Sequence, residues 1–460
     1  MTWTALKKTI SLGIASFFIA MSAFAGTSKV QAPPTSVTIN ADTLKKMLLE
    51  QNIGLLIQMN KVYQAKQQIN IKRADLLPSI NLGGIISSGP SFALTTISSL
   101  LPFLMPSNWF DLKQSQYLLN AQATSYYIAQ LNTYSSAYAL YMTVVGDLEL
   151  RDVLYSQYLN YKQIEELIQL AVDAGMMQQS DLLQAQAQSQ LAFIQVSQVD
   201  ELLKQEKASI REMLALPLST EIAFEKNHVA PSANETLPLQ TLVDRSLKNS
   251  PEISQMTSMI SAANTAKWSA AFSWLTGASL GRSRSGGESA FGGLTASGTV
   301  GLGFGYFPTL KLSDYNIDEL KLEKTQITYD NAQLIESTVG SLTEAQKQVE
   351  MATLAQNNLQ QVYNGELDKF RAGMTDLLHV LSAANSLTTA LTNKVKAQAD
   401  LDTLRVSLNR VMLDEKFSQV GACEIKRKSS GGIGGRLGRI FHPTKDQVTL
   451  DEICGPQTLN

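Results

Sequence analysis

The two halves of this sequence match each other at one fixed offset. Residues 174–176 and residues 372–374 both read Ala-Gly-Met, 198 positions apart. Further short matches follow at this offset without a gap and in the same order: Thr43-Leu44 with Thr241-Leu242, Leu82-Gly83 with Leu280-Gly281, Leu112-Lys113 with Leu310-Lys311, and Leu203 with Leu401. Scattered identities arise by chance, but ordered blocks along one offset indicate an internal duplication. The duplicated unit of nearly 200 residues is far longer than the repeats of solenoid proteins.

The N-terminus has the pattern of an export signal. Lys7 and Lys8 precede an uncharged and mostly apolar stretch, and Ala23-Phe24-Ala25 supplies small residues for cleavage. An anchoring helix is the less favoured alternative, because the apolar run is short and ends in a cleavage motif. We therefore predict a signal peptide over residues 1–25, followed by an extended linker over residues 26–40.

The rest of the chain divides into two copies of one helical unit. Each copy is predicted to contain a helix, a β-hairpin, a very long helix, a tight turn and a returning helix. The first helix, over residues 41–77, is expected to be continuous up to Pro78. The predicted segments are repeat 1 at 41–216, with its hairpin at about 78–108 and its turn at 173–178, a linker at 217–238, repeat 2 at 239–414, with its hairpin at about 275–308 and its turn at 371–375, and a tail at 415–460.

The hairpin segments have the pattern of membrane-spanning strands. From Thr295 to Tyr306, apolar residues at even positions alternate with small or polar residues at odd positions. Aromatic residues beside the hairpins could anchor them at a membrane surface: Trp109, Phe110, Trp268, Trp274, Tyr306 and Phe307. A soluble hairpin has the same period, but the scarcity of charge favours the membrane. Two strands per copy cannot close a barrel, and lipid does not tolerate open strand edges, so several chains would have to share one barrel.

Tyrosines recur along the first long helix, which is predicted over residues 112–172. Tyr127, Tyr134, Tyr141 and Tyr155 follow a seven-residue spacing, with Leu148 between the last two. The second copy repeats this spacing with Leu320, Ile327 and Leu334. A seven-residue repeat is typical of packed helices, and we favour packing over the alternative of a ligand-binding stripe.

Each long helix is predicted to end at an Ala-Gly-Met turn. Gly175 and Gly373 suit a helix C-terminus in the left-handed conformation. Ser180-Asp181 and Thr375-Asp376 offer side chains that can cap the helix that follows.

Motifs for catalysis, metal binding or nucleic-acid binding are missing from the sequence. The three histidines, His228, His379 and His442, lie far apart, and the formal net charge is only −2. No nucleophile elbow, phosphate-binding loop or zinc-protease motif occurs. We therefore predict no enzyme, no cofactor, no metal site and no nucleic-acid partner.

The C-terminal tail departs from the repeat. It contains the basic run Lys426-Arg427-Lys428 and the only cysteines, Cys423 and Cys454. In an exported protein the two cysteines can form a disulfide, which we favour over two free thiols.

Taken together, the chain resembles the TolC-like outer-membrane efflux protein family over about residues 40–415. Leu76-Leu77-Pro78 before the first hairpin, Asn249-Ser250-Pro251-Glu252 in repeat 2 and the two Ala-Gly-Met turns carry the resemblance through their order and spacing. The fold that it implies is mainly α with a small β part. Each chain would be a tandem-duplicated long-helix protomer of an α-barrel, and its two β-hairpins would contribute to a trimeric 12-stranded transmembrane β-barrel.

The resemblance also implies partners and a location. A homotrimer would lie in the outer membrane of a Gram-negative bacterium, in contact with its lipid, and extend far into the periplasm. A periplasmic adaptor, joined to an inner-membrane pump, would dock at the turns. The implied docking residues are Ala174, Gly175, Met176, Ala372, Gly373 and Met374.

Some members of that family carry carboxylates just past the second turn, which form a ring at a constriction. Here His379 and Ser382 follow the second turn, and Asp181 follows the first. Phe370, before the second turn, has no hydroxyl to donate. A ring containing His379 would select ions differently and would respond to pH.

The function that follows is a passive exit duct of a tripartite efflux or type I secretion system. The alternative is a periplasmic helical-bundle protein with a structural or interaction role in a secretion machine, which has the same fold but does not conduct.

Overall fold

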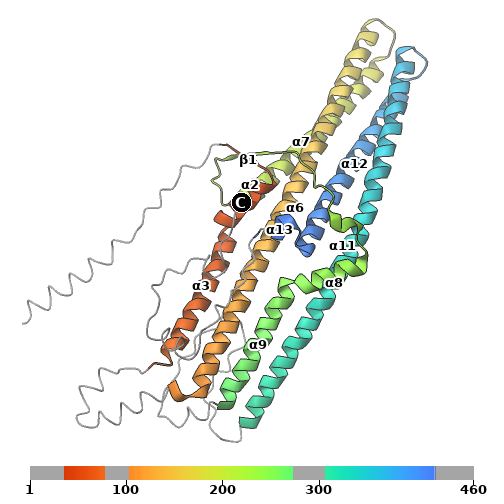
Figure 1. The fold of residues 1–460 in the computed structure, drawn as a ribbon. Helices are drawn as coiled ribbons and strands as arrows, with labels where there is room; N and C mark the ends of the chain where they lie inside the picture. Colours follow the sequence, from red (N-terminus) through yellow and green to blue (C-terminus); the bar gives the residue numbers. More distant parts are fainter. Residues whose placement is uncertain (1–35, 78–102, 273–305, 419, 421–460) are drawn as a thin grey trace, which may run out of the picture.

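The computed structural model describes residues 36–77, 103–272, 306–418 and 420. The expected signal peptide, most of both expected hairpins, Trp274 and both cysteines lie outside these residues. Where it is described, the chain is mainly α-helical, as predicted. Figure 1 shows an elongated body of helices lying side by side.

Two very long helices run along the whole body and the shorter helices pack against them. The first half of the chain contains β1 (Ser36–Ile39), α2 (Ala41–Gln51), α3 (Ile53–Ala74), α6 (Pro106–Asp173) and α7 (Gln179–Met213). The second half contains β2 (Glu221–Phe224), the 3₁₀ helix η2 (Ala233–Thr236), α8 (Leu239–Asn249), α9 (Pro251–Phe272), α11 (Tyr306–Arg371), α12 (Leu377–Met412) and α13 (Glu415–Ser418). At 1.5 Å per residue, the 68 residues of α6 span about 100 Å.

The element bounds recur at the offset found in the sequence. Helices α8, α9 and α12 begin 198 residues after α2, α3 and α7, and α11 ends 198 residues after α6. This correspondence supports the expectation of a duplicated unit.

Along its length the body divides into two halves, and each of them is four helices wide. Toward the end that carries α3, helix α6 packs against α3 and α9, and α9 packs against α11. Toward the end that carries α7, helix α6 packs against α7 and α12, and α12 packs against α11. Between these halves lie α2, α8 and the strands, and we call this middle region the waist (Figure 1).

The prediction of one continuous helix over residues 41–77 is wrong, because the helix breaks at Asn52. The backbone of Asn52 is extended (ψ 120°), and its Oδ1 accepts the Leu55 N–H at 3.0 Å, which caps α3. Its Nδ2 donates to the Met213 carbonyl at 2.8 Å and so links the break to the end of α7. Ser250 takes the same place in the second half, where its hydroxyl accepts the Ile253 N–H at 3.3 Å.

The waist contains a two-stranded parallel sheet that local sequence patterns did not predict. Strand β1 pairs with β2 in the register Ser36↔Glu221 to Ile39↔Phe224. Part of the expected N-terminal linker is therefore a strand, and it pairs with part of the linker between the repeats. Ile39 is fully buried in this arrangement.

The tyrosine repeat of α6 forms part of the core. Tyr127, Tyr134 and Tyr141 are buried in one apolar cluster with residues of α2 and α7, which confirms the packing interpretation for these three. Tyr155 differs, because 42% of its surface is exposed. Phe417 of α13 packs its ring 5.0 Å from that of Tyr134, so the folded body extends past residue 414.

In the second copy of the long helix, only part of the predicted stripe is buried. Leu320 is buried, and Ile327 packs beside it in a cluster with α9. Leu334 is exposed, and the neighbouring Ile335 is the buried residue. A one-residue drift of this kind is expected because a straight helix has 3.6 rather than 3.5 residues per turn.

The predicted hairpin ends need a correction. Residues 106–108 and 306–308 are helical, because α6 begins at Pro106 and α11 begins at Tyr306. Proline is well suited to the first turn of a helix. The N–H groups of that turn have no acceptor within the helix, so the absence of an N–H in proline costs no hydrogen bond. Trp109 Nε1 donates to the Phe103 carbonyl at 2.9 Å, and Phe110 stacks on Phe272 at 5.7 Å. Among the described helices, none has a run of apolar residues sufficient to cross a membrane.

Candidate functional site: the two helix turns

The α6–α7 turn lies at one end of the body (Figure 1) and has a Schellman geometry. The Gly175 N–H donates to the Val172 carbonyl at 2.9 Å, and the Met176 N–H donates to the Ala171 carbonyl at 2.8 Å. These two bonds satisfy carbonyls that the end of α6 would otherwise leave without a partner. Gly175 is left-handed (φ 73°), as predicted.

The α11–α12 turn repeats this geometry. The Gly373 N–H donates to the Phe370 carbonyl at 2.9 Å, and the Met374 N–H donates to the Lys369 carbonyl at 2.8 Å. Gly373 is also left-handed (φ 70°). At either glycine, an added Cβ would meet no atom within 4 Å beyond the adjoining residues of the chain, so backbone conformation rather than crowding favours glycine here.

The helices that follow the two turns are capped in different ways. Asp376 caps α12 as predicted, because its Oδ1 accepts the His379 N–H at 3.1 Å. The prediction of a Ser180 or Asp181 cap for α7 is wrong, because α7 begins earlier and its N-cap is Gln178. Asp181 instead reaches back from the third helical position and accepts the Gln178 N–H at 3.2 Å.

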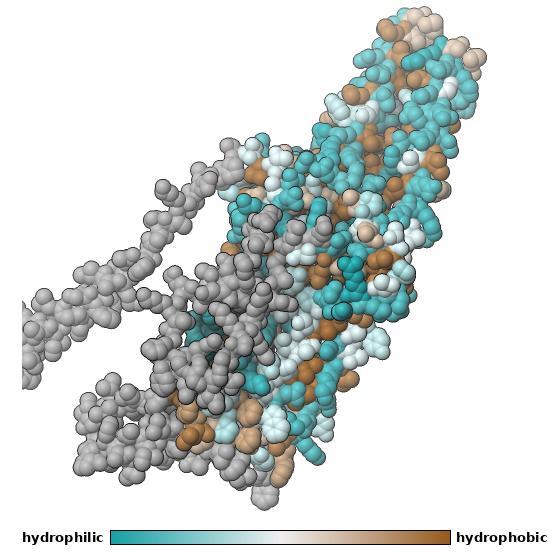
Figure 2. Space-filling model, in the orientation of Figure 1, coloured by the Kyte–Doolittle hydropathy of each residue, from teal (hydrophilic) through white to brown (hydrophobic). Residues whose placement is uncertain are grey.

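The two turns carry exposed apolar side chains above a packed core. Met176 and Met374 are 76% and 73% exposed, and Leu170 and Leu378 beside them are also exposed. Ala174 and Ala372 are exposed as well. In Figure 2 hydrophobic residues show at this end of an otherwise mostly hydrophilic shaft. Beneath the turns, side chains of all four helices form one apolar cluster, which includes Ile168, Leu182, Tyr363 and Leu377.

Of the four predicted constriction residues, two are exposed and two are partly buried. His379 and Ser382 are exposed and lie three residues apart, so they share one face of α12. Phe370 is partly buried against the apolar cluster beneath the turns. Asp181 is half-buried and engaged in capping α7.

Glu366 of α11 also lies near His379, and the sequence did not reveal it. Glu366 accepts a hydrogen bond from Lys369 at 2.6 Å and one from the Thr375 hydroxyl at 3.4 Å. The Lys369 bond, with a smaller contribution from His379, holds the pKa of the Glu366 carboxyl below its ordinary value. Only the turn brings Glu366 close to His379, since they stand thirteen positions apart in the chain.

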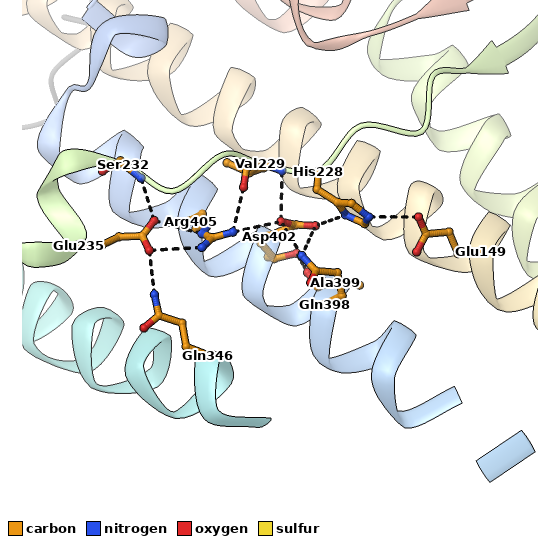
Figure 3. Close-up of polar contacts among 11 residues, drawn as sticks. Glu149, His228, Val229, Ser232, Glu235, Gln346, Gln398, Ala399, Asp402 and Arg405 are labelled. Carbon is orange, nitrogen blue, oxygen red and sulfur yellow. Dashed lines mark hydrogen bonds and ion pairs between the residues drawn. The ribbon is translucent and has the colours of Figure 1, made fainter. Parts of the chain in front are cut away.

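A polar network at the waist, shown in Figure 3, was also not predicted from the sequence. The Asp402 side chain of α12 is only 3% exposed and lies 2.7 Å from His228 Nδ1, while His228 Nε2 lies 3.3 Å from Glu149 of α6. Arg405 contacts Glu235 at 3.1 Å and donates to the Val229 carbonyl at 2.9 Å. These contacts fix the linker between the repeats to α12, and the linker sequence has no periodicity that could have indicated them.

The fold of the chain is shared with solved structures of outer-membrane channels. No protein-family model matches the chain, and no curated protein matches it. Solved structures do match. The CmeC outer-membrane channel of Campylobacter jejuni has a TM-score of 0.62 and 14% identity, over 81% of this chain and 85% of that one.

Two further solved structures have the same fold. The outer-membrane protein VceC of Vibrio cholerae has a TM-score of 0.61 and 13% identity, over 81% of this chain and 95% of that one. The open state of the Neisseria gonorrhoeae MtrE outer-membrane channel has a TM-score of 0.57 and 14% identity, over 81% and 88%. At these identities the likeness shows a shared fold, and that fold is the TolC-like one that the sequence predicted.

Proposed function

We propose that this protein is the outer-membrane exit duct of a tripartite efflux or type I secretion system. It would conduct substrates passively from its periplasmic end to the exterior. The observation that carries the proposal is the fold, since 81% of the chain superposes on most of a C. jejuni outer-membrane channel.

The channel would be a homotrimer of tandem-duplicated chains in the outer membrane of a Gram-negative bacterium. The two predicted hairpins of each chain would complete a 12-stranded barrel in the lipid. Helix ends with aromatic side chains support this placement, because Trp268 and Phe307 are exposed at the end of the body from which both hairpin segments leave. Aromatic side chains of this kind are enriched at membrane surfaces.

The opposite end would dock a periplasmic adaptor joined to an inner-membrane pump. The six turn residues Ala174, Gly175, Met176, Ala372, Gly373 and Met374 would form the contact. Their exposure supports this role, since the two methionines offer adaptable apolar surface and the glycines let a partner backbone approach closely.

The constriction would lie beside the second turn. His379 and Ser382 would face the conduit, with Phe370 packed behind them and Asp181 on α7. Between Leu377 and Ala399, α12 contains no acidic residue. The conduit along α12 would therefore lack the ring of negative charge that favours cations.

Conductance tests the proposal directly. Purified, detergent-solubilised protein would be added to a planar lipid bilayer, and its subunit number would be measured by cross-linking. We expect discrete conductance steps from a trimer. A soluble protein that never inserts would contradict the channel and leave the periplasmic structural role.

The ion selectivity of that channel tests the constriction. His379→Asp should shift the reversal potential under a salt gradient toward cation preference, because it adds three carboxylates per trimer at the narrowest point. Asn357→Asp adds the same charge on an exposed face of α11, away from the turn, and should leave the reversal potential unchanged. Equal shifts in both variants would show that His379 does not line the constriction.

A further inference from the structure

The seam between α6 and α7 follows a strict alternation of three and four residues. Its buried positions on α7 are Leu182, Ala185, Ser189, Ala192, Val196, Val199, Leu203, Glu206 and Ile210. This is the spacing of coiled-coil seams, whose positions are normally apolar. Glu206 is the one ionisable residue in the series, and it is only 8% exposed.

A second carboxyl group faces Glu206 across this seam. Asp147 of α6 is half-buried and lies within hydrogen-bonding reach of the Glu206 side chain. Two carboxyl groups can hydrogen-bond to each other only when one of them carries a proton. One oxygen of Glu206, Oε2, is buried, and no donor among the described residues hydrogen-bonds to it.

Three cationic or potentially cationic side chains around the pair, Arg151, Lys226 and His228, contact other carboxyl groups. Arg151 of α6 pairs with Asp200 of α7 at 2.6 Å. The linker and α12 contribute three further contacts in which both partners lie outside the pair: Lys226 with Asp152, His228 with Glu149, and His228 with Asp402. Lys207 is the next residue after Glu206 on α7, and neighbouring residues of a helix do not face each other.

The second half of the chain builds the corresponding seam without these acids. The positions 198 residues after Asp147 and Glu206 are Ala345 and Leu404. Both lie in one apolar cluster between α11 and α12. A seam of this geometry therefore does not require a carboxyl group at either position.

We propose that Asp147 and Glu206 share one proton across the α6–α7 seam, and that loss of this proton opens the seam locally. The seam is closed while one carboxyl donates to the other. With both groups ionised, two negative charges would face each other in a buried site, and separation lets water solvate them. The first seam would thus respond to pH, while the second would not.

The direction of the pH response follows from proton binding. Burial, and then Asp147, raise the pKa of Glu206 to about 8 from its ordinary 4.5, and burial raises the pKa of Asp147. Between pH 4.5 and about pH 8, the two ends of the shift in the Glu206 pKa, the closed seam holds a proton that the open seam releases. Opening therefore becomes easier as pH rises, by about tenfold in the opening equilibrium per pH unit for one linked proton.

Hydrogen exchange of the full-length protein in detergent tests this proposal, with the second seam as an internal control. Peptides from residues 140–154 and 199–213 report the first seam, and peptides from 338–352 and 397–411 report the second. From pH 5 to pH 8, exchange at the first seam should accelerate relative to the second, and Glu206→Leu should abolish this difference. An equal pH response of both seams, or no effect of the substitution, would overturn the proposal.

Infrared spectroscopy tests the shared proton even if Glu206→Leu does not fold. The wild-type spectrum minus that of Glu206→Gln should contain the band of a protonated carboxyl at neutral pH, and this band should disappear with a midpoint near pH 8. The exposed Glu201→Gln is the matched control and should leave the band in place. Absence of this band from the wild-type protein at neutral pH would contradict the proposal of a shared proton.

Discussion

Gly146 lies where α6 packs tightly against Ala399 of α12. A Cβ at this position would lie 2.7 Å from the Cβ of Ala399, which is shorter than side chains tolerate. Gly146→Ala should therefore lower the free energy of unfolding by about 1–3 kcal/mol through overpacking. Chemical denaturation of the purified protein measures this loss.

Two further variants show whether the contact with Ala399 is the cause. Adding Ala399→Gly to Gly146→Ala should recover part of the stability, because it removes the atom that clashes. Gly340→Ala in α11 has open space around its Cβ and should stabilise the protein by up to about 1 kcal/mol, as alanine does in helices. Equal losses for Gly146→Ala and Gly340→Ala would contradict the packing argument.

At the scale of helices, four C-terminal turns share one backbone conformation but not one residue type. Gly175 and Gly373 are left-handed, and so are Ala215 and Leu413 after the returning helices (φ 50° and 51°). Ala215 is exposed, so Ala215→Gly should raise the free energy of unfolding by about 1 kcal/mol. Gly175→Ala should lower it by a similar amount, and opposite signs in denaturation curves are the expected result.

Sequence patterns predicted most helices because their signals are local. Gly175 and Gly373 ended the long helices where expected, and the seven-residue spacing of Tyr134 and Tyr141 indicated their burial. The break at Asn52 was missed, because asparagine occurs inside helices as well as at their starts. Pairing of β1 with β2, and of His228 with Asp402, joins residues more than 170 positions apart, and no local pattern indicates such contacts.

For the candidate site, the structure shows where the predicted residues lie, while their docking and constriction roles stay predictions. His379 and Ser382 do lie on one exposed face of α12 beside the second turn. The capping role of Asp181 depends on where α7 begins, and the first helical residue is difficult to infer from sequence alone. Glu366 came close to His379 only through the folded turn.

At the scale of the whole molecule, Arg410 joins three helices. It donates from α12 to Asn132 of α6 and pairs with Glu252 of α9. Burial alone would raise the pKa of Glu252, but the charge and hydrogen bond of Arg410 outweigh it and hold this pKa below 4.5. The pair therefore contributes stability above pH 4.5 that is lost as the pH falls through the folded-state pKa.

Glu252→Gln tests this contribution. At neutral pH it should lower the free energy of unfolding by about 1–3 kcal/mol, because Arg410 loses a charged partner. The difference between wild type and variant should shrink as the pH falls below 4.5, which denaturation curves at several pH values would show. A difference that stays constant with pH would contradict the ionic role of Glu252.

The broken and unbroken helices give the body unequal bending stiffness. Helices α6 and α11 pass through the waist as single rods, while α3 and α7 are separate pieces there, and so are α9 and α12. From Tyr141 at the waist to Asp173 at the turn, α6 rises about 50 Å. Over this length of about 50 Å, bending the body by one degree at the waist displaces the turns by about 1 Å. Small rearrangements in the middle of the molecule are thus amplified at its far end.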